Sequence, residues 1–95
     1  AQVGFMKSLA AELAPRGIRV NTVNPGPVNN GFQNDIEERM TGLETSKANA
    51  SFNELIPLGR HAETEEIAHA MLFLAGPNSK MITSTTFRVD GGMAG

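Results

Sequence analysis

The 95-residue sequence predicts an α/β fold with two parallel strands, because two helical patterns alternate with two short β-branched runs. The first run, Ile18 to Val23, stops abruptly at Asn24-Pro25-Gly26-Pro27, whose residues set the direction of the backbone. The order helix, strand, polar segment, helix, strand is that of the last third of a doubly wound parallel sheet. Parallel strands need partners on their edges, so we expect the carboxyl-terminal part of such a fold, incomplete by itself.

Length and composition limit the function classes. Ninety-five residues with 40% apolar side chains allow one small core and therefore one domain at most. A net charge of −2 gives no basic surface for nucleic acid. No apolar run approaches the ~20 residues of a membrane span and no leader opens the chain, so we expect a cytoplasmic protein that binds no membrane. The absence of cysteine excludes disulfides and thiolate metal sites.

The first helix is predicted over residues ~2 to 14. Pro15 ends it by biasing Ala14 away from the α region, and Gly17 can adopt the left-handed conformation that turns the chain into the strand. The apolar residues that recur at steps of three and four are Val3, Met6, Leu9, Ala10 and Leu13.

The turn after the first strand lies where open α/β sheets bind ligands. Pro25 and Pro27 remove two backbone donors and fix φ, while Gly26 leaves one position without a side chain, so that a flat group can lie against the main chain. An ordinary surface turn fits this composition equally well.

Residues ~32 to 56 are polar, with few apolar positions, and predict one or two weak helices. Connections this long in compact domains are usually functional or mobile. The carboxylates of Asp35, Glu37 and Glu38 suggest a metal site, but no histidine accompanies them, so we interpret them as a solvated helix face and predict no metal.

The second helix follows Glu63 or Thr64, one of which must be its N-cap. Apolar residues occupy more than one stripe from Ile67 to Ala75, which predicts burial on two sides. We interpret His61 as a loop residue and His69 as a surface or interface residue, and assign neither a catalytic role. A second strand is predicted near residues 85 to 89.

Several motifs, in order and at matching spacing, resemble the carboxyl-terminal portion of a short-chain dehydrogenase/reductase, and in particular the members similar to 3-oxoacyl-carrier-protein reductases. The resemblance covers nearly the whole chain. Its motifs are Ala14-Pro15-Arg16-Gly17, the strand with Asn21, Pro25-Gly26, Pro57-Leu58-Gly59-Arg60, Glu65-Glu66-Ile67-Ala68, Phe73-Leu74-Ala75 and Val89-Asp90-Gly91-Gly92.

The resemblance implies a Rossmann-like parent protein, an NAD(P)-dependent oxidoreductase that interconverts a small-molecule alcohol and a carbonyl by hydride transfer. Residues 1–95 would form the carboxyl-terminal segment of its single domain, with residues 32–56 as the substrate lid. Family members assemble as homodimers or homotetramers, which implies an interface on the helix Ile67 to Ala75 and the last strand.

The resemblance also implies a cofactor site at Pro25, Gly26, Pro27, Val28 and Asn30. In the family, the backbone at the position of Val28 reaches the nicotinamide carboxamide. Asn30 stands where a threonine often touches the same group or the pyrophosphate, and its amide retains a hydrogen-bond donor.

The catalytic motif of the family is not found in these residues. The family's Tyr-x-x-x-Lys precedes the first helix, and the alignment places its lysine two positions before Ala1; the chain contains no tyrosine and no GxGxxG loop. We therefore assign no catalytic residue, expect the 95-residue chain alone to be inactive, and leave NAD versus NADP open. The alternative is a non-catalytic assembly module derived from the family. Ser84 stands where the family commonly has glycine.

Overall fold

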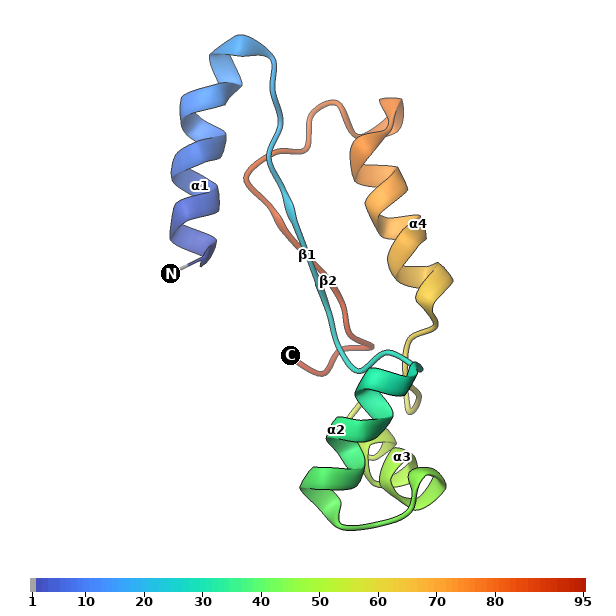
Figure 1. Ribbon diagram of the computed structural model, residues 1–95. Coiled ribbons are helices and arrows are strands. Elements are labelled where there is room, and N and C mark those ends of the chain that lie inside the picture. Colours follow the sequence, from blue (N-terminus) through green and yellow to red (C-terminus); the bar gives the residue numbers. More distant parts are fainter. Residues whose placement is uncertain (1) are drawn as a thin grey trace.

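The computed structural model describes residues 2–95, apart from the side chain of Gln2, in an elongated shape of 50 × 27 × 23 Å. Two strands run side by side between two helices, and a pair of further helices lies beyond one end of the strands (Figure 1). The elements are α1 (Gln2–Leu13), β1 (Thr22–Pro25), α2 (Gly31–Thr41), α3 (Thr45–Asn53), α4 (Thr64–Ala75) and β2 (Thr86–Val89), with 3₁₀ turns at Ala14–Arg16 and Pro77–Ser79.

The two strands form a parallel sheet, as the sequence predicts. Thr22 pairs with Thr86 at one end of the register and Pro25 pairs with Val89 at the other. The carboxyl ends of both strands therefore lie together, at the end of the sheet from which α2 and α3 project (Figure 1).

The prediction of the first helix is confirmed, with α1 ending at Leu13. Met6 and Ala10, four residues apart on one face, are its buried residues. The chain then tightens into a 3₁₀ turn containing Pro15, and Gly17 adopts the expected left-handed conformation with φ of 75°.

The first strand begins later than the sequence predicts, at Thr22 rather than Ile18. Side chains replace the regular ladder over the preceding residues, because the Val20 amide donates to Thr83 Oγ1 at 3.1 Å. Asn21 bridges to the other strand segment, donating to the Ile82 carbonyl at 3.0 Å and accepting from the Thr85 amide at 3.0 Å. This asparagine side chain and one backbone bond, from the Ser84 amide to the Val20 carbonyl at 2.8 Å, join the two segments before the regular ladder begins.

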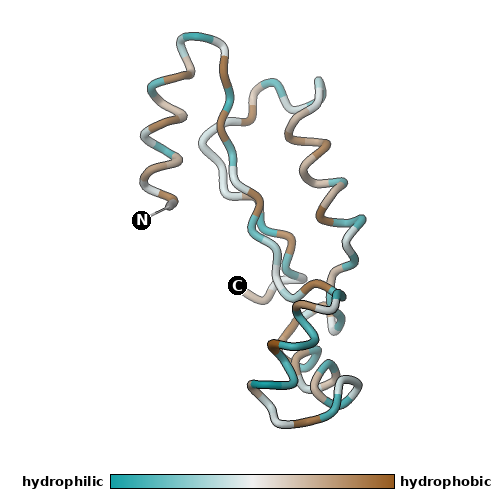
Figure 2. Tube along the Cα trace, in the orientation of Figure 1, coloured by the Kyte–Doolittle hydropathy of each residue, from teal (hydrophilic) through white to brown (hydrophobic). Residues whose placement is uncertain are grey.

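The polar segment folds into two helices joined by a tight turn. Asn30 caps α2, and Gly42 ends it with a left-handed φ of 71°. Hydrophilic residues dominate α2, whereas α4 is mainly apolar (Figure 2). The α2–α3 hairpin, residues 31–53, coincides with most of the expected lid.

The helix α4 covers one face of the two strands. Its N-cap is Glu63, one of the two residues expected there, and its Leu74 is buried. Phe73 meets Phe87 of β2 edge to face, with ring centroids 6.3 Å apart. Leu72, on another side of α4, is 69% exposed, so the apolar breadth of this helix exceeds the surface that the strands cover. No helix within residues 2–95 has the length and hydropathy needed to cross a membrane.

Candidate cofactor and lid site

Three backbone segments meet at the carboxyl ends of the strands. The Gly26 amide donates to the Val89 carbonyl at 3.0 Å, which joins the turn to the end of β2. The third segment is the connection between α3 and α4, whose Ala62 amide donates to the Pro27 carbonyl at 3.0 Å. This convergence places the turn predicted from the sequence at the ligand-binding end of a parallel sheet.

Gly26 allows the two strand ends to approach closely. A Cβ atom built on Gly26 would lie 2.8 Å from Asp90 Cβ and 2.9 Å from Asp90 Cα, closer than carbon atoms can pack. Asp90 therefore occupies the side toward which a side chain would project. The flat group expected from the sequence has to approach the turn from another side.

Val28 presents its backbone away from the rest of the turn. It forms a parallel bridge with Ala62, in which the Pro27 carbonyl accepts from Ala62 and the Asn29 amide donates to the Ala62 carbonyl at 2.8 Å. A parallel bridge uses the groups that flank the central residue, so the N–H and C=O of Val28 itself point to the opposite edge. One donor and one acceptor are thus directed outward from the turn.

Asn30 uses one half of its side chain to start α2. Its Oδ1 accepts a hydrogen bond from the Gln33 amide at 2.8 Å. The side-chain NH₂ remains as a donor next to the turn. Asn30 therefore belongs both to the turn and to the hairpin that follows.

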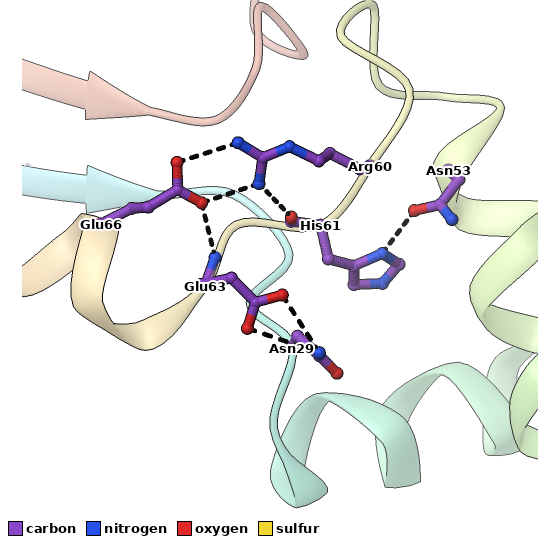
Figure 3. A network of polar contacts seen from close by, with 6 residues as sticks. All are labelled: Asn29, Asn53, Arg60, His61, Glu63 and Glu66. Atoms are coloured by element: carbon purple, nitrogen blue, oxygen red, sulfur yellow. Dashed lines mark hydrogen bonds and ion pairs between the residues drawn. The ribbon is translucent and has the colours of Figure 1, made fainter.

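Arg60 clamps the start of α4 (Figure 3). Its guanidinium holds both carboxylate oxygens of Glu66, at 2.7 and 2.9 Å, and donates to the His61 carbonyl at 3.0 Å. Glu66 also accepts from the Glu63 amide at 2.9 Å. The hydrogen bond from Arg60, aided by that amide, lowers the pKa of Glu66 to about 2, and Glu66 in turn raises the pKa of Arg60.

The sequence interpretation of Glu37 as part of a solvated face is wrong. Glu37 is fully buried, and its Oε2 lies 2.5 Å from His61 Nε2. His61, expected to be an ordinary loop residue, is only 8% exposed, and its Nδ1 lies 2.5 Å from Asn53 Oδ1 (Figure 3). The cause is the direction of α2, which turns its Gln33–Glu37–Thr41 face inward while Met40 is 72% exposed. Helical spacing of apolar residues gives no signal for such a polar inner face.

No cluster of three or more histidine, aspartate or glutamate side chains capable of holding a metal occurs in the part of the chain that the structure describes. Glu37 and His61 form a pair rather than a metal-ligand set. The chemistry available at this end of the sheet is therefore hydrogen bonding by the outward groups of Val28 and the amide of Asn30, beside a helical hairpin fixed by a buried polar pair.

Comparison with known proteins gives a consistent result. Residues 1–94 match the protein family described as enoyl-(acyl carrier protein) reductase. The 3-oxoacyl-[acyl-carrier-protein] reductase FabG of Aquifex aeolicus is 42% identical over 91 residues, which cover 96% of this chain and 34% of that protein.

Solved structures share the arrangement of elements. A short chain dehydrogenase family protein from Francisella tularensis superposes with a TM-score of 0.89 at 34% identity, over 97% of this chain and 39% of that one. YwfH, an NADPH dependent reductase involved in bacilysin biosynthesis, gives 0.89 at 30% identity, over 96% of this chain and 35% of its own. The chain spans about a third of the length of the curated relatives that it matches.

Proposed function

The chain belongs to the short-chain dehydrogenase/reductase family, and from this premise we propose that it is the carboxyl-terminal segment of the single domain of an NAD(P)-dependent oxidoreductase. The complete protein would interconvert an alcohol and a carbonyl by hydride transfer. Residues 1–95 would supply the turn on the nicotinamide side, the substrate lid and an oligomer interface. The observation that carries this proposal is the outward-facing backbone of Val28 at the carboxyl end of β1.

The turn fits a nicotinamide ring. The carboxamide of nicotinamide has one carbonyl acceptor and one NH₂ donor, and the main chain of Val28 offers the complementary donor and acceptor in one residue. When bound, the nicotinamide supplies or accepts the hydride. Pro25, Gly26 and Pro27 hold this backbone in place, and the NH₂ of Asn30 adds a second donor.

The α2–α3 hairpin suits the role of a lid over a carbonyl substrate. It follows the turn directly, and Phe32 and Met40 of α2 are 76% and 72% exposed. These residues stand eight positions apart, so they lie on the same side of the helix and offer an apolar surface to a substrate. One relative is a 3-oxoacyl-[acyl-carrier-protein] reductase, which supports a carbonyl substrate for this protein. Another is an NADPH dependent reductase, which supports an NAD(P)H cofactor.

The exposed apolar side of α4 supports assembly into a homodimer or homotetramer. Met71 and Leu72 are 57% and 69% exposed, next to the face of α4 that packs on the strands. Burial of such side chains against a second copy would stabilise the assembly by roughly 1.5–3 kcal/mol for each side chain fully buried.

Hydride transfer by the complete protein tests the proposal. Purified protein is mixed with NADH or NADPH and with ketones, aldehydes and 3-oxoacyl thioesters, and the loss of reduced-nicotinamide absorbance is followed. The proposal predicts carbonyl-dependent oxidation with one of the two nucleotides. A folded, assembled protein that oxidises neither would favour the non-catalytic assembly module.

A paired substitution tests the Val28 contact. Val28→Pro removes the outward N–H, whereas the bonds to Ala62 are made by the Pro27 carbonyl and the Asn29 amide, which the substitution does not remove. Loss of one hydrogen bond of about 0.5–1.5 kcal/mol predicts a weakening of nucleotide affinity by roughly 2- to 13-fold. Val28→Ala, which keeps the backbone donor, is the control and should bind as the unchanged protein does.

A further inference from the structure

The α2–α3 hairpin has a polar centre. Glu37 is its largest fully buried side chain, and Ala48 is the only other residue of the hairpin that is buried within the described range of the chain. Glu37 Oε2 is bonded by Gln33 Nε2 at 2.9 Å and faces His61, whereas Glu37 Oε1 is buried without a hydrogen-bond partner among the described residues. Burial of a carboxyl group costs free energy unless the group has a hydrogen-bond partner. The contact with His61 therefore restricts the positions that the hairpin can adopt.

His61 joins three segments of the chain through one ring. Its Nε2 faces Glu37 of α2 at 2.5 Å, and its Nδ1 faces the Oδ1 atom of Asn53, at the end of α3, at 2.5 Å. Both ring nitrogens therefore face oxygen atoms. Asn53 Oδ1 can only accept, so Nδ1–H donates to it, and Nε2 is hydrogen-bonded to Glu37 Oε2. His61 itself belongs to the connection that leads to α4, so its ring fixes both helices of the hairpin to that connection.

The connection that contains His61 also contains the residue that pairs with Val28. Ala62, the residue after His61, forms the bridge to Val28, and the His61 carbonyl accepts from Arg60. The hairpin and the turn are thus held by neighbouring residues of one segment. A shift of the His61 ring moves the hairpin relative to Val28.

A polar link of this kind favours one position over its neighbours. An apolar interface permits helices to slide with small changes in contact, whereas a buried imidazole ring with an oxygen atom at each nitrogen is satisfied in a single arrangement. Such pairs add little to stability compared with apolar residues of the same volume, and positional specificity is their best-attested use.

We propose that Glu37 and His61 are positioning residues that hold the α2–α3 hairpin at a fixed distance from the Val28 turn and thereby set the pose of the carbonyl substrate. The proposal rests on the proposed function, since it assigns the substrate to the space between the hairpin and the turn. Neither residue touches the reacting atoms; both act through the placement of the hairpin.

Hydrogen–deuterium exchange in the complete protein tests, without any activity measurement, whether the Glu37–His61 pair holds the hairpin. Glu37→Leu removes the partner of His61, and Asp35→Leu changes an exposed carboxylate of the same helix as a matched control. Glu37→Gln keeps a hydrogen bond, because its NH₂ group donates to His61 Nε2. We expect faster exchange over residues 31–53 in Glu37→Leu only, with residues 64–75 unchanged in all three. Equal exchange over residues 31–53 in all three variants would overturn the proposal.

Steady-state kinetics separate positioning from general destabilisation. If Glu37→Leu displaces the hairpin by about 1 Å, we expect KM for the carbonyl substrate to rise roughly 10- to 100-fold. KM for the nucleotide should stay within about twofold of its value in the unchanged protein. Glu37→Gln should restore KM for the carbonyl substrate. His61→Leu and the double variant should show the same KM as Glu37→Leu, because the two residues act as a unit. A fall in kcat with both KM values unchanged would mark a merely structural role and contradict the proposal.

The two proposals fail in different ways. If the unchanged protein shows no hydride transfer, the proposed function fails, and the exchange measurement still decides whether the pair holds the hairpin. If hydride transfer is present but Glu37→Leu leaves the substrate KM unchanged, the enzyme assignment stands and the positioning role is refuted.

Discussion

Substitution of Gly26 by alanine should separate the ends of the two strands. The new Cβ would lie 2.8 Å from Asp90 Cβ, and carbon atoms pack at about 3.5 Å or more, so the strand ends must part by about 0.7 Å. A rigid shift of that size would stretch the bond from the Gly26 amide to the Val89 carbonyl from 3.0 Å to about 3.7 Å, outside hydrogen-bonding range. Overpacking costs about 1–3 kcal/mol and the lost bond about 0.5–1.5 kcal/mol, so we expect a loss of roughly 1.5–4.5 kcal/mol in the free energy of unfolding.

Denaturant unfolding of the complete protein measures this loss, and nucleotide titration measures its consequence at Val28, two residues away. The matched control is Gly31→Ala at the start of α2, where an added Cβ meets no atom within 4 Å. Alanine there should be neutral or stabilise by up to about 1 kcal/mol. If Gly26→Ala unfolds within about 0.5 kcal/mol of the unchanged protein, the close approach of the strands is not a constraint and the reasoning is refuted.

Three further predictions concern local features. Ser84 has φ of 60°, a conformation that glycine adopts without strain, so Ser84→Gly should stabilise by about 0.5–1 kcal/mol in thermal unfolding; destabilisation would show that the serine side chain is needed. The pKa of Glu66 is lowered from its ordinary value of 4.5 to about 2. The Arg60–Glu66 ion pair therefore contributes its full stabilisation above pH 4.5, and this stabilisation is lost as the pH falls through about 2. Arg60→Gln should therefore move the carboxyl titration of Glu66, followed by NMR, upward; an unchanged midpoint would contradict the assignment. Leu72→Asp should dissociate the oligomer in light scattering, and a folded variant of unchanged mass would refute the interface on α4.

The choice of Leu72 for the last test comes from the structure. From the sequence, Phe73 is the natural probe of the same interface, because it is the largest apolar residue of the helix. In the structure the Phe73 ring packs on Phe87, so an aspartate there would also disturb the contact between α4 and β2. Helical periodicity shows that a helix has more than one apolar side, but not which side meets its own sheet.

The fold class and the family resemblance predicted from the sequence are confirmed, since they depend on local signals. Gly17 and Pro15 act where a helix must stop, and the parallel direction of β1 and β2 is the one expected from the order of elements. The early start predicted for the first strand is wrong because Asn21 replaces ladder bonds with side-chain bonds, which β-branched composition does not reveal.

The candidate site was predictable only in part. The prolines and glycine of residues 25–28 predict a turn at the end of the first strand, and the structure has a turn there. Its role as a cofactor site stays a prediction. The pair of Glu37 and His61 was not found, because its two members are far apart in the sequence and each alone is typical of a solvated surface. Only the packing of α2 against the connection after α3 brings them together.

A structure of the complete protein with a nicotinamide nucleotide bound tests the role of the Val28 backbone most directly. We expect the carboxamide to lie at the carboxyl end of β1, with the main-chain N–H or C=O of Val28 at a hydrogen-bond distance of about 2.7–3.2 Å from it. A bound nucleotide whose carboxamide faces a different segment of the chain would show that Val28 does not bind the nicotinamide.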